Sequence, residues 1–140
     1  MNAEEINTRK EIEKAWLRYW DVYVKFNKIP RESRQATFGA VAMDPELADL
    51  LTAAPIADSK KIQNFGYVTH HIYWGPPVAG KRSAVIGDCT DQSNFGIENS
   101  QTKEKRGFGS AAANYNGTLQ KDSRGQWKVS FLDYREDTPC

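Results

Sequence analysis

Two histidines and two aspartates are the residues of this sequence best suited to proton transfer. His70 and His71 are adjacent, and Asp88 and Asp91 flank Cys89. A histidine titrates near neutral pH, so one that faces a cavity could act as a general acid or base with a carboxylate as partner. Neighbouring residues of a strand point to opposite faces, so the two histidines cannot easily share one metal ion. The structural alternatives are a half-buried or surface histidine and a turn capped by the two aspartates.

A second candidate site is the segment GPPVAGKR at residues 75–82, which looks like a phosphate-binding loop. Such a loop needs Ser or Thr after its lysine to hold magnesium, whereas Arg82 follows Lys81 here. Pro76 and Pro77 each remove a backbone N–H donor as well. We interpret the segment as a plain hairpin connection. Because no cysteine or carboxylate stands at a zinc-site spacing from the histidines either, we expect no metal and no cofactor.

Aromatic side chains recur along one face of the first predicted helix, at Trp16, Tyr19, Trp20 and Tyr23. They could line a ligand cavity with phenolic donors, or they could simply pack the core. Both hold if one part of the face packs on a sheet while another borders the mouth of a pocket. Our full set of pocket candidates is Trp16, Tyr19, Trp20, Tyr23, His70, His71, Asp88 and Tyr115.

Three helices are expected to position these residues. Residues 3–27 show the three-four spacing of an amphipathic helix, with acidic residues near its start and lysines near its end, and Pro30 stops it. A second helix, more weakly patterned, is expected from residue 31 to about residue 41. A third begins with Asp44 as N-cap, followed by proline in the first turn, and is expected to end at Pro55.

From Phe65 onward the helical period is lost and strands take over. β-Branched and aromatic residues, and apolar residues alternating with polar ones, are typical of strands. The expected strands are residues 67–74, 83–89, 95–98, 107–120 and 127–131, with a turn at 122–125. Helices followed by antiparallel strands predict an α+β fold, in which N-terminal helices pack on a curved antiparallel sheet as a cone.

The composition fits one globular domain spanning residues 1–140, with 39% hydrophobic and 26% charged residues. The 19 basic residues nearly cancel the 18 acidic ones, so charge gives no support to nucleic-acid binding. The apolar runs are too short to span a bilayer, and the N-terminus lacks the apolar core of a signal peptide. If Met1 is the native start, the chain is expected to stay in the cytosol.

The two cysteines, Cys89 and Cys140, allow two interpretations. A reduced and unrelated pair is normal for a protein without a leader. Alternatively, a disulfide joins the C-terminal tail to the sheet, which would close a loop of about 50 residues and contribute roughly 2–4 kcal/mol. The residues alone leave both interpretations open.

Four segments carry a resemblance to a known family: AWLRYWDVYV (15–24), AVIGDCTDQS (84–93), GQWKVSFLD (125–133) and the terminal TPC (138–140). With the order of elements, they resemble the NTF2-like (cystatin-like, SnoaL-like) superfamily, closest to small actinobacterial secreted proteins and lipoproteins. The pattern D-C-x-D-x-S with a terminal cysteine is the most specific part. The resemblance implies a Cys89–Cys140 disulfide and an exported or membrane-anchored domain of the cell envelope whose leader is absent from this sequence. The superfamily also includes isomerases and dehydratases, but a shared fold is not a shared activity.

We therefore expect a non-enzymatic NTF2-like module that binds a small apolar ligand or a protein partner, and that forms a homodimer through its sheet. No complete acid–base or metal set can be assembled from the sequence. The alternative is a small cofactor-independent isomerase, dehydratase or hydrolase that uses His70 or His71 with Asp88 and a tyrosine, Tyr23 or Tyr115. A buried histidine that bonds a carboxylate and opens into an apolar cavity would favour the enzyme. A solid core or a solvent-facing histidine would remove it.

Overall fold

The computed structural model describes all 140 residues, as three helices followed by seven strands. The helices are α1 (Ala3–Tyr23), α2 (Arg31–Gly39) and α3 (Glu46–Ser59), with a short 3₁₀ helix η1 (Phe26–Lys28) after α1. The strands are β1 (Ile62–Gly66), β2 (Ile72–Trp74), β3 (Ser83–Thr90), β4 (Phe95–Asn99), β5 (Lys105–Phe108), β6 (Ala113–Lys121) and β7 (Trp127–Tyr134). The predicted α+β class is therefore confirmed.

The helix boundaries differ from the predicted ones at α1 and α3. α1 is capped by Asn2, whose side chain accepts a hydrogen bond from the Glu5 N–H at 2.9 Å, and it ends at Tyr23 instead of residue 27. The prediction that Pro55 ends the third helix is wrong, because α3 continues through it to Ser59. Packing explains the difference, since Ala54 and Ala57, on either side of the proline, are buried and offset the one lost backbone hydrogen bond.

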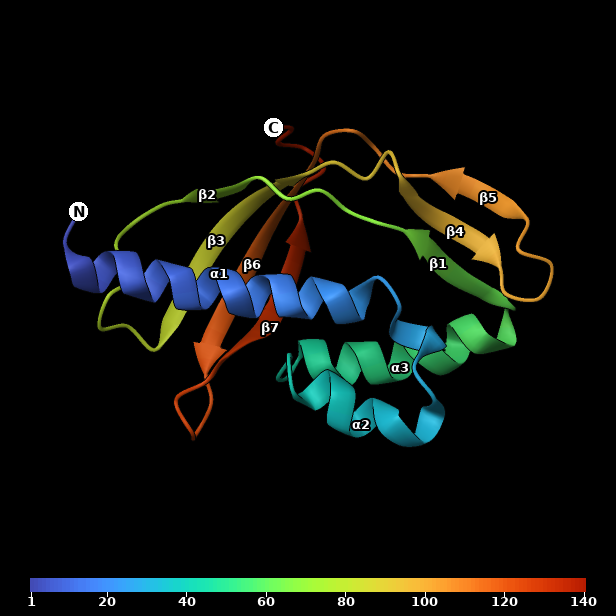
Figure 1. Cartoon of the computed structure of the whole chain (residues 1–140), viewed down its shortest axis with the longest axis horizontal. Coiled ribbons are helices and arrows are strands. Elements are labelled where there is room, and N and C mark those ends of the chain that lie inside the picture. Colours follow the sequence, from blue (N-terminus) through green and yellow to red (C-terminus); the bar gives the residue numbers. More distant parts are fainter.

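The strands form two antiparallel sheets instead of the predicted single one. One sheet has the order β2-β3-β6-β7 and the other has the order β1-β4-β5. The predicted strands at 67–74 and 107–120 are wrong as continuous elements, because both are interrupted where the chain passes between the sheets. Backbone hydrogen bonds still link the crossing segments, such as Thr69 N–H to Asp91 O at 3.0 Å. The two sheets therefore behave as one curved surface with a sharp bend (Figure 1).

A glycine permits the bend at the end of β1. Gly66 has a φ of +84°, which favours glycine over residues with a side chain. A Cβ at this position would also lie 1.8 Å from the carbonyl oxygen of Asn94. Any other residue would push the two crossing segments apart.

The core lies between α1 and the inner face of the four-stranded sheet, which α1 crosses in Figure 1. Trp16, Tyr19 and Trp20 are at most 1% exposed. Trp16 rests directly on β6 at Gly117, where a Cβ would come within 2.1 Å of the indole ring. Three of the four residues of the predicted aromatic face are thus buried in the core, and the fourth, Tyr23, is half-buried.

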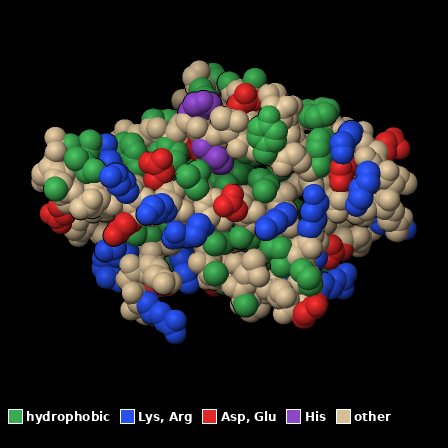
Figure 2. Space-filling view, in the orientation of Figure 1, with side chains coloured by type: hydrophobic (Ala, Val, Ile, Leu, Met, Phe, Trp, Pro, Cys, Tyr) green, Lys and Arg blue, Asp and Glu red, His purple; other side chains and the backbone are tan.

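The outer face of the four-stranded sheet is free of helices (Figure 1). Val85 and Phe131 lie on this face, in register with Thr118 between them, and are 56% and 50% exposed. This is the face through which a homodimer is predicted, and the homodimer stays a prediction. Basic and acidic side chains are mixed over the side of the molecule drawn in Figure 2. None of the helices has the length and apolar character that a membrane span requires.

Candidate functional site

The carboxylate of Asp88 is fully buried and makes three hydrogen-bond contacts. Asp88 is 0% exposed, and its Oδ2 accepts a hydrogen bond from Trp16 Nε1 at 2.7 Å. His70 Nδ1 lies 2.6 Å from the same oxygen, and the backbone N–H of His71 donates to Oδ1 at 2.9 Å. These contacts satisfy a buried charge that would otherwise be costly to keep.

Three elements bring these groups together. Asp88 points inward from β3, opposite Tyr115 of β6 in the strand register. Trp16 reaches it from the middle of α1, and the crossing segment of residues 67–71 supplies the two histidine contacts. The capping prediction is confirmed for Asp91, whose carboxylate accepts from the N–H and hydroxyl of Ser93, and is wrong for Asp88.

The two histidines have different surroundings. The His70 side chain is 17% exposed and stacks edge-on against Trp20 with ring centroids 5.3 Å apart. His71 is exposed, and its Nδ1 lies 2.9 Å from the carbonyl oxygen of Cys89. Only His70 is therefore paired with a carboxylate. No group of three or more histidine, cysteine or acidic side chains is arranged to ligate a metal ion.

The predicted tyrosines pack against other aromatic rings of the core. Trp20 contacts both Tyr23 and Tyr115, with centroids 5.0 and 5.4 Å apart, and Tyr19 donates a hydrogen bond to the carboxylate of Glu46. Burial raises the pKa of Tyr23 to about 12 and also raises the pKa of Tyr115. Both phenols are therefore neutral at physiological pH and can donate hydrogen bonds without carrying charge.

The segment that resembles a phosphate-binding loop is the hairpin connection between β2 and β3, as predicted. Two backbone N–H groups of this connection already donate to a carboxylate of the protein itself. Glu5 of α1 accepts hydrogen bonds from the N–H groups of Val78 and Ala79, each at 2.9 Å, and from Arg9 Nε at 2.7 Å. The Ala79 N–H does most to lower the pKa of Glu5, with further lowering from Arg9 and Val78.

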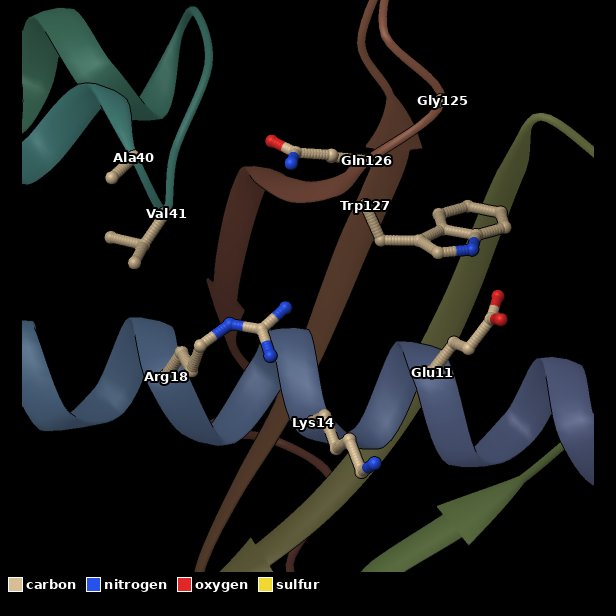
Figure 3. A pocket seen from close by; sticks show the side chains of 8 residues that line it. All are labelled: Glu11, Lys14, Arg18, Ala40, Val41, Gly125, Gln126 and Trp127. Atoms are coloured by element: carbon tan, nitrogen blue, oxygen red, sulfur yellow. The ribbon is translucent and has the colours of Figure 1, made fainter.

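Of the three main hollows, the one with the greatest volume is an open groove of about 620 Å³ beside α1, lined mostly by polar residues. Figure 3 shows Glu11, Lys14 and Arg18 on successive turns of the helix, opposite Gln126 and Trp127 of the β6–β7 hairpin. Its lining is charged on one side, and it contains none of the predicted pocket residues.

Two further hollows adjoin each other along the inner face of β1 and β4, and we call them together the β1–β4 groove. One hollow of about 220 Å³ lies between this face and α3, and the other, of about 440 Å³, extends toward β5. Ile62 and Ile97 line both hollows, so the two hollows lie next to each other. The remaining lining residues are Tyr23, Phe26, Leu50, Ala53, Ala57, Gln63, Asn64, Gln92, Phe95, Gly96, Arg106, Gly107, Phe108 and Gly109.

The structure divides the predicted pocket residues into two sets. Tyr23 lines the β1–β4 groove, whereas the other seven line none of the three main hollows. Six of these seven form a packed cluster, namely Trp16, Tyr19, Trp20, His70, Asp88 and Tyr115, and the seventh, His71, is exposed. The residues of β1, β4 and β5 that line the groove were not among the predicted pocket residues. The alternating apolar pair Phe95 and Ile97 was the available signal, but it could not say which face of the strand was left open.

The disulfide lies on the other side of β3 from the Asp88 cluster. Cys89 and Cys140 are bonded, with Cα atoms 5.8 Å apart. The tail is held further by Asn114, whose amide donates to the carbonyl oxygen of Thr138 at 2.6 Å. The pairing that the family resemblance implied is therefore present.

The shape of the whole chain matches that of a ketosteroid isomerase-like protein from Erwinia carotovora atroseptica. The TM-score is 0.51 over 94% of this chain and 95% of the other, at 18% sequence identity. The chain has the NTF2-like fold. No protein-family model and no curated protein matches the sequence. At 18% identity the likeness shows the NTF2-like fold alone, and the function has to be argued from the site.

Proposed function

We propose that this NTF2-like domain is a non-enzymatic binding module that holds a small apolar ligand in the β1–β4 groove. The observation that carries the proposal is that two largely apolar hollows share the lining residues Ile62 and Ile97. The hollows have volumes of about 440 and 220 Å³, and a ligand that filled both would occupy a space typical of small-molecule sites.

The lining of the groove supports an apolar occupant. Seven of the nine residues around the smaller hollow are hydrophobic, and Ile97 remains 43% exposed although it lies in the middle of the groove. Covering such side chains removes apolar area from water, which favours binding by about 25 cal/mol per Å² before the costs of association.

One contact favours a second candidate, the small cofactor-independent isomerase, dehydratase or hydrolase. His70 and Asp88 form a close histidine–carboxylate pair at 2.6 Å, as a general base would require. Such an enzyme also needs a substrate cavity beside the histidine, and none of the three main hollows is lined by His70 or Asp88. The space next to the pair is filled by Trp16 and Trp20. The geometry therefore supports binding better than catalysis.

Filling the groove tests the proposal. A Cβ on Gly107 would meet no atom within 4 Å, and Gly107 pairs with Ile97 on the groove face of β4 and β5. Gly107→Leu should therefore place a side chain in the groove without a clash. We expect this variant to lose at least tenfold in affinity for the neutral dye Nile red, measured by its fluorescence, because the leucine occupies the dye's space.

Gly75→Leu is the matched control, because a Cβ there also meets nothing within 4 Å and Gly75 lies outside the groove. It should bind the dye as the wild type does. Equal binding by Gly107→Leu and the wild type would sink the proposal. The groove would serve a protein partner instead if the wild type bound no apolar molecule and another protein shielded Ile97 from solvent.

A further inference from the structure

We propose that the ligand of the β1–β4 groove is an elongated apolar molecule with one acidic head group, and that Arg106 binds this head. The inference rests on the proposed function, because it assigns the chemistry and orientation of a ligand in the same groove. It follows from where the groove carries charge and where it does not.

Arg106 is the only charged residue among those that line the two hollows. It forms no salt bridge in the protein, whereas its neighbour Lys105 is paired with Glu98. Glu98 also accepts a hydrogen bond from Gln63, so this nearby carboxylate is already occupied. Arg106 therefore borders the groove, and no carboxylate of the protein is paired with its charge.

A break in the strand register gives Arg106 its position. Ile97 pairs with Gly107 and Glu98 pairs with Lys105, so Arg106 is an extra residue with no partner on β4. Such bulges re-aim side chains and are common beside functional sites. Here the bulge places an arginine at the border of an otherwise uncharged groove.

The opposite end of the groove offers no charge. It is formed by Tyr23, Phe26 and the α3 residues Leu50, Ala53 and Ala57. The pKa of Tyr23 is raised to about 12 by burial, so its phenol stays neutral. An acidic head is thus directed to Arg106, and the apolar body crosses Ile62 and Ile97 toward α3.

The charge of arginine suits an acidic oxygen group better than a neutral one. A guanidinium presents several N–H donors in a fixed plane, which match two oxygens of a carboxylate or a phosphate, and such charge-assisted bonds are stronger than neutral ones. The head could be either acid, since both share this chemistry.

Displacement of Nile red by matched ligands tests the inference. Decanoic acid, decyl phosphate and decanol have the same apolar chain and differ only in the head. We expect both acids to bind the wild type about tenfold more tightly than the alcohol. Arg106→Gln should remove this preference and leave the affinity for decanol unchanged, and added salt should weaken only the binding of the acids.

Arg124→Gln, which removes an exposed arginine outside the groove, should keep the full preference. Equal affinity of the wild type for acid and alcohol, or an unchanged preference in Arg106→Gln, would overturn the inference and leave the binding proposal standing. If neither acid nor alcohol displaces the dye, the binding proposal fails together with it. If decanoic acid binds more tightly than decyl phosphate, the head group of the ligand is a carboxylate, and if decyl phosphate binds more tightly, it is a phosphate.

Discussion

The buried side chain of Asp88 has the contacts of a catalytic carboxylate, but these contacts stabilise the fold. Its carboxylate joins α1, β3 and the segment that crosses between the two sheets, through Trp16, His70 and His71. Each of these contacts would also be expected around a general base and its partner. The cluster has no adjoining main hollow, so its clearest physical effect is on stability.

Removal of this carboxylate should therefore destabilise the protein strongly. Asp88→Ala leaves the buried Trp16 N–H and the His71 N–H without their acceptor, and it breaks the contact with His70. We expect the free energy of unfolding to fall by about 3–5 kcal/mol, measured by urea denaturation.

Asp133→Ala is the control, because the Asp133 side chain is 44% exposed and has only a long contact of 3.8 Å to Arg135. Its effect should stay within about 0.5 kcal/mol. A loss of under 1 kcal/mol in Asp88→Ala would show that the cluster contributes little to folding and would reopen a catalytic role.

At the scale of elements, the first turn of α1 holds the β2–β3 connection in place. Glu5 accepts the N–H groups of Val78 and Ala79 and is itself 6% exposed. These bonds require the ionised carboxylate, which is why they lower the pKa of Glu5. A lowered pKa means that the stabilising effect is present above the unfolded-state value and is lost as the pH falls through the folded-state value.

Hydrogen exchange should detect this clamp. In the wild type, protection of the Val78 and Ala79 amides should decrease as the pH falls below about 4.5, because Glu5 becomes protonated. Glu5→Gln should weaken the protection and remove its dependence on pH. Glu4→Gln, in the same turn but exposed, should behave like the wild type. Identical exchange in all three proteins would contradict the role of Glu5.

At the scale of the whole molecule, two devices hold the bent sheets and the tail together. The crossing segments are hydrogen-bonded to each other, and the disulfide fastens the last residue to β3 across 51 positions of the sequence. A cross-link of this kind stabilises mainly by limiting the unfolded chain. Export to an oxidising compartment remains the prediction drawn from the family resemblance.

Loss of the disulfide should lower stability by a measurable amount. We expect Cys140→Ser to reduce the free energy of unfolding by about 2–4 kcal/mol. A reducing agent should cause the same loss in the wild type and no further loss in the variant. Denaturant curves of the wild type that coincide with and without reductant would show that the bond does not constrain the chain.

The sequence alone determined the features that depend on local patterns. The three-four spacing of Trp16, Tyr19, Trp20 and Tyr23 predicted a helix with one apolar face, and that face packs on the sheet. The order of helices and strands predicted the α+β class, and two prolines together with Arg82 predicted a hairpin where a nucleotide loop was the alternative. Such patterns act between residues close in the chain, so they can be read from it.

Only the tertiary structure decided which distant residues meet. Trp16 bonds Asp88 across 72 positions, and the split into two sheets follows from crossing segments that look like strands. Pro55 is tolerated because Ala54 and Ala57 of the same helix are buried. The groove depends on Ile62, Ile97 and a bulge at Arg106, none of which is a motif. A hollow is space that packed side chains leave empty, so its position depends on all the surrounding residues together and not on any one segment.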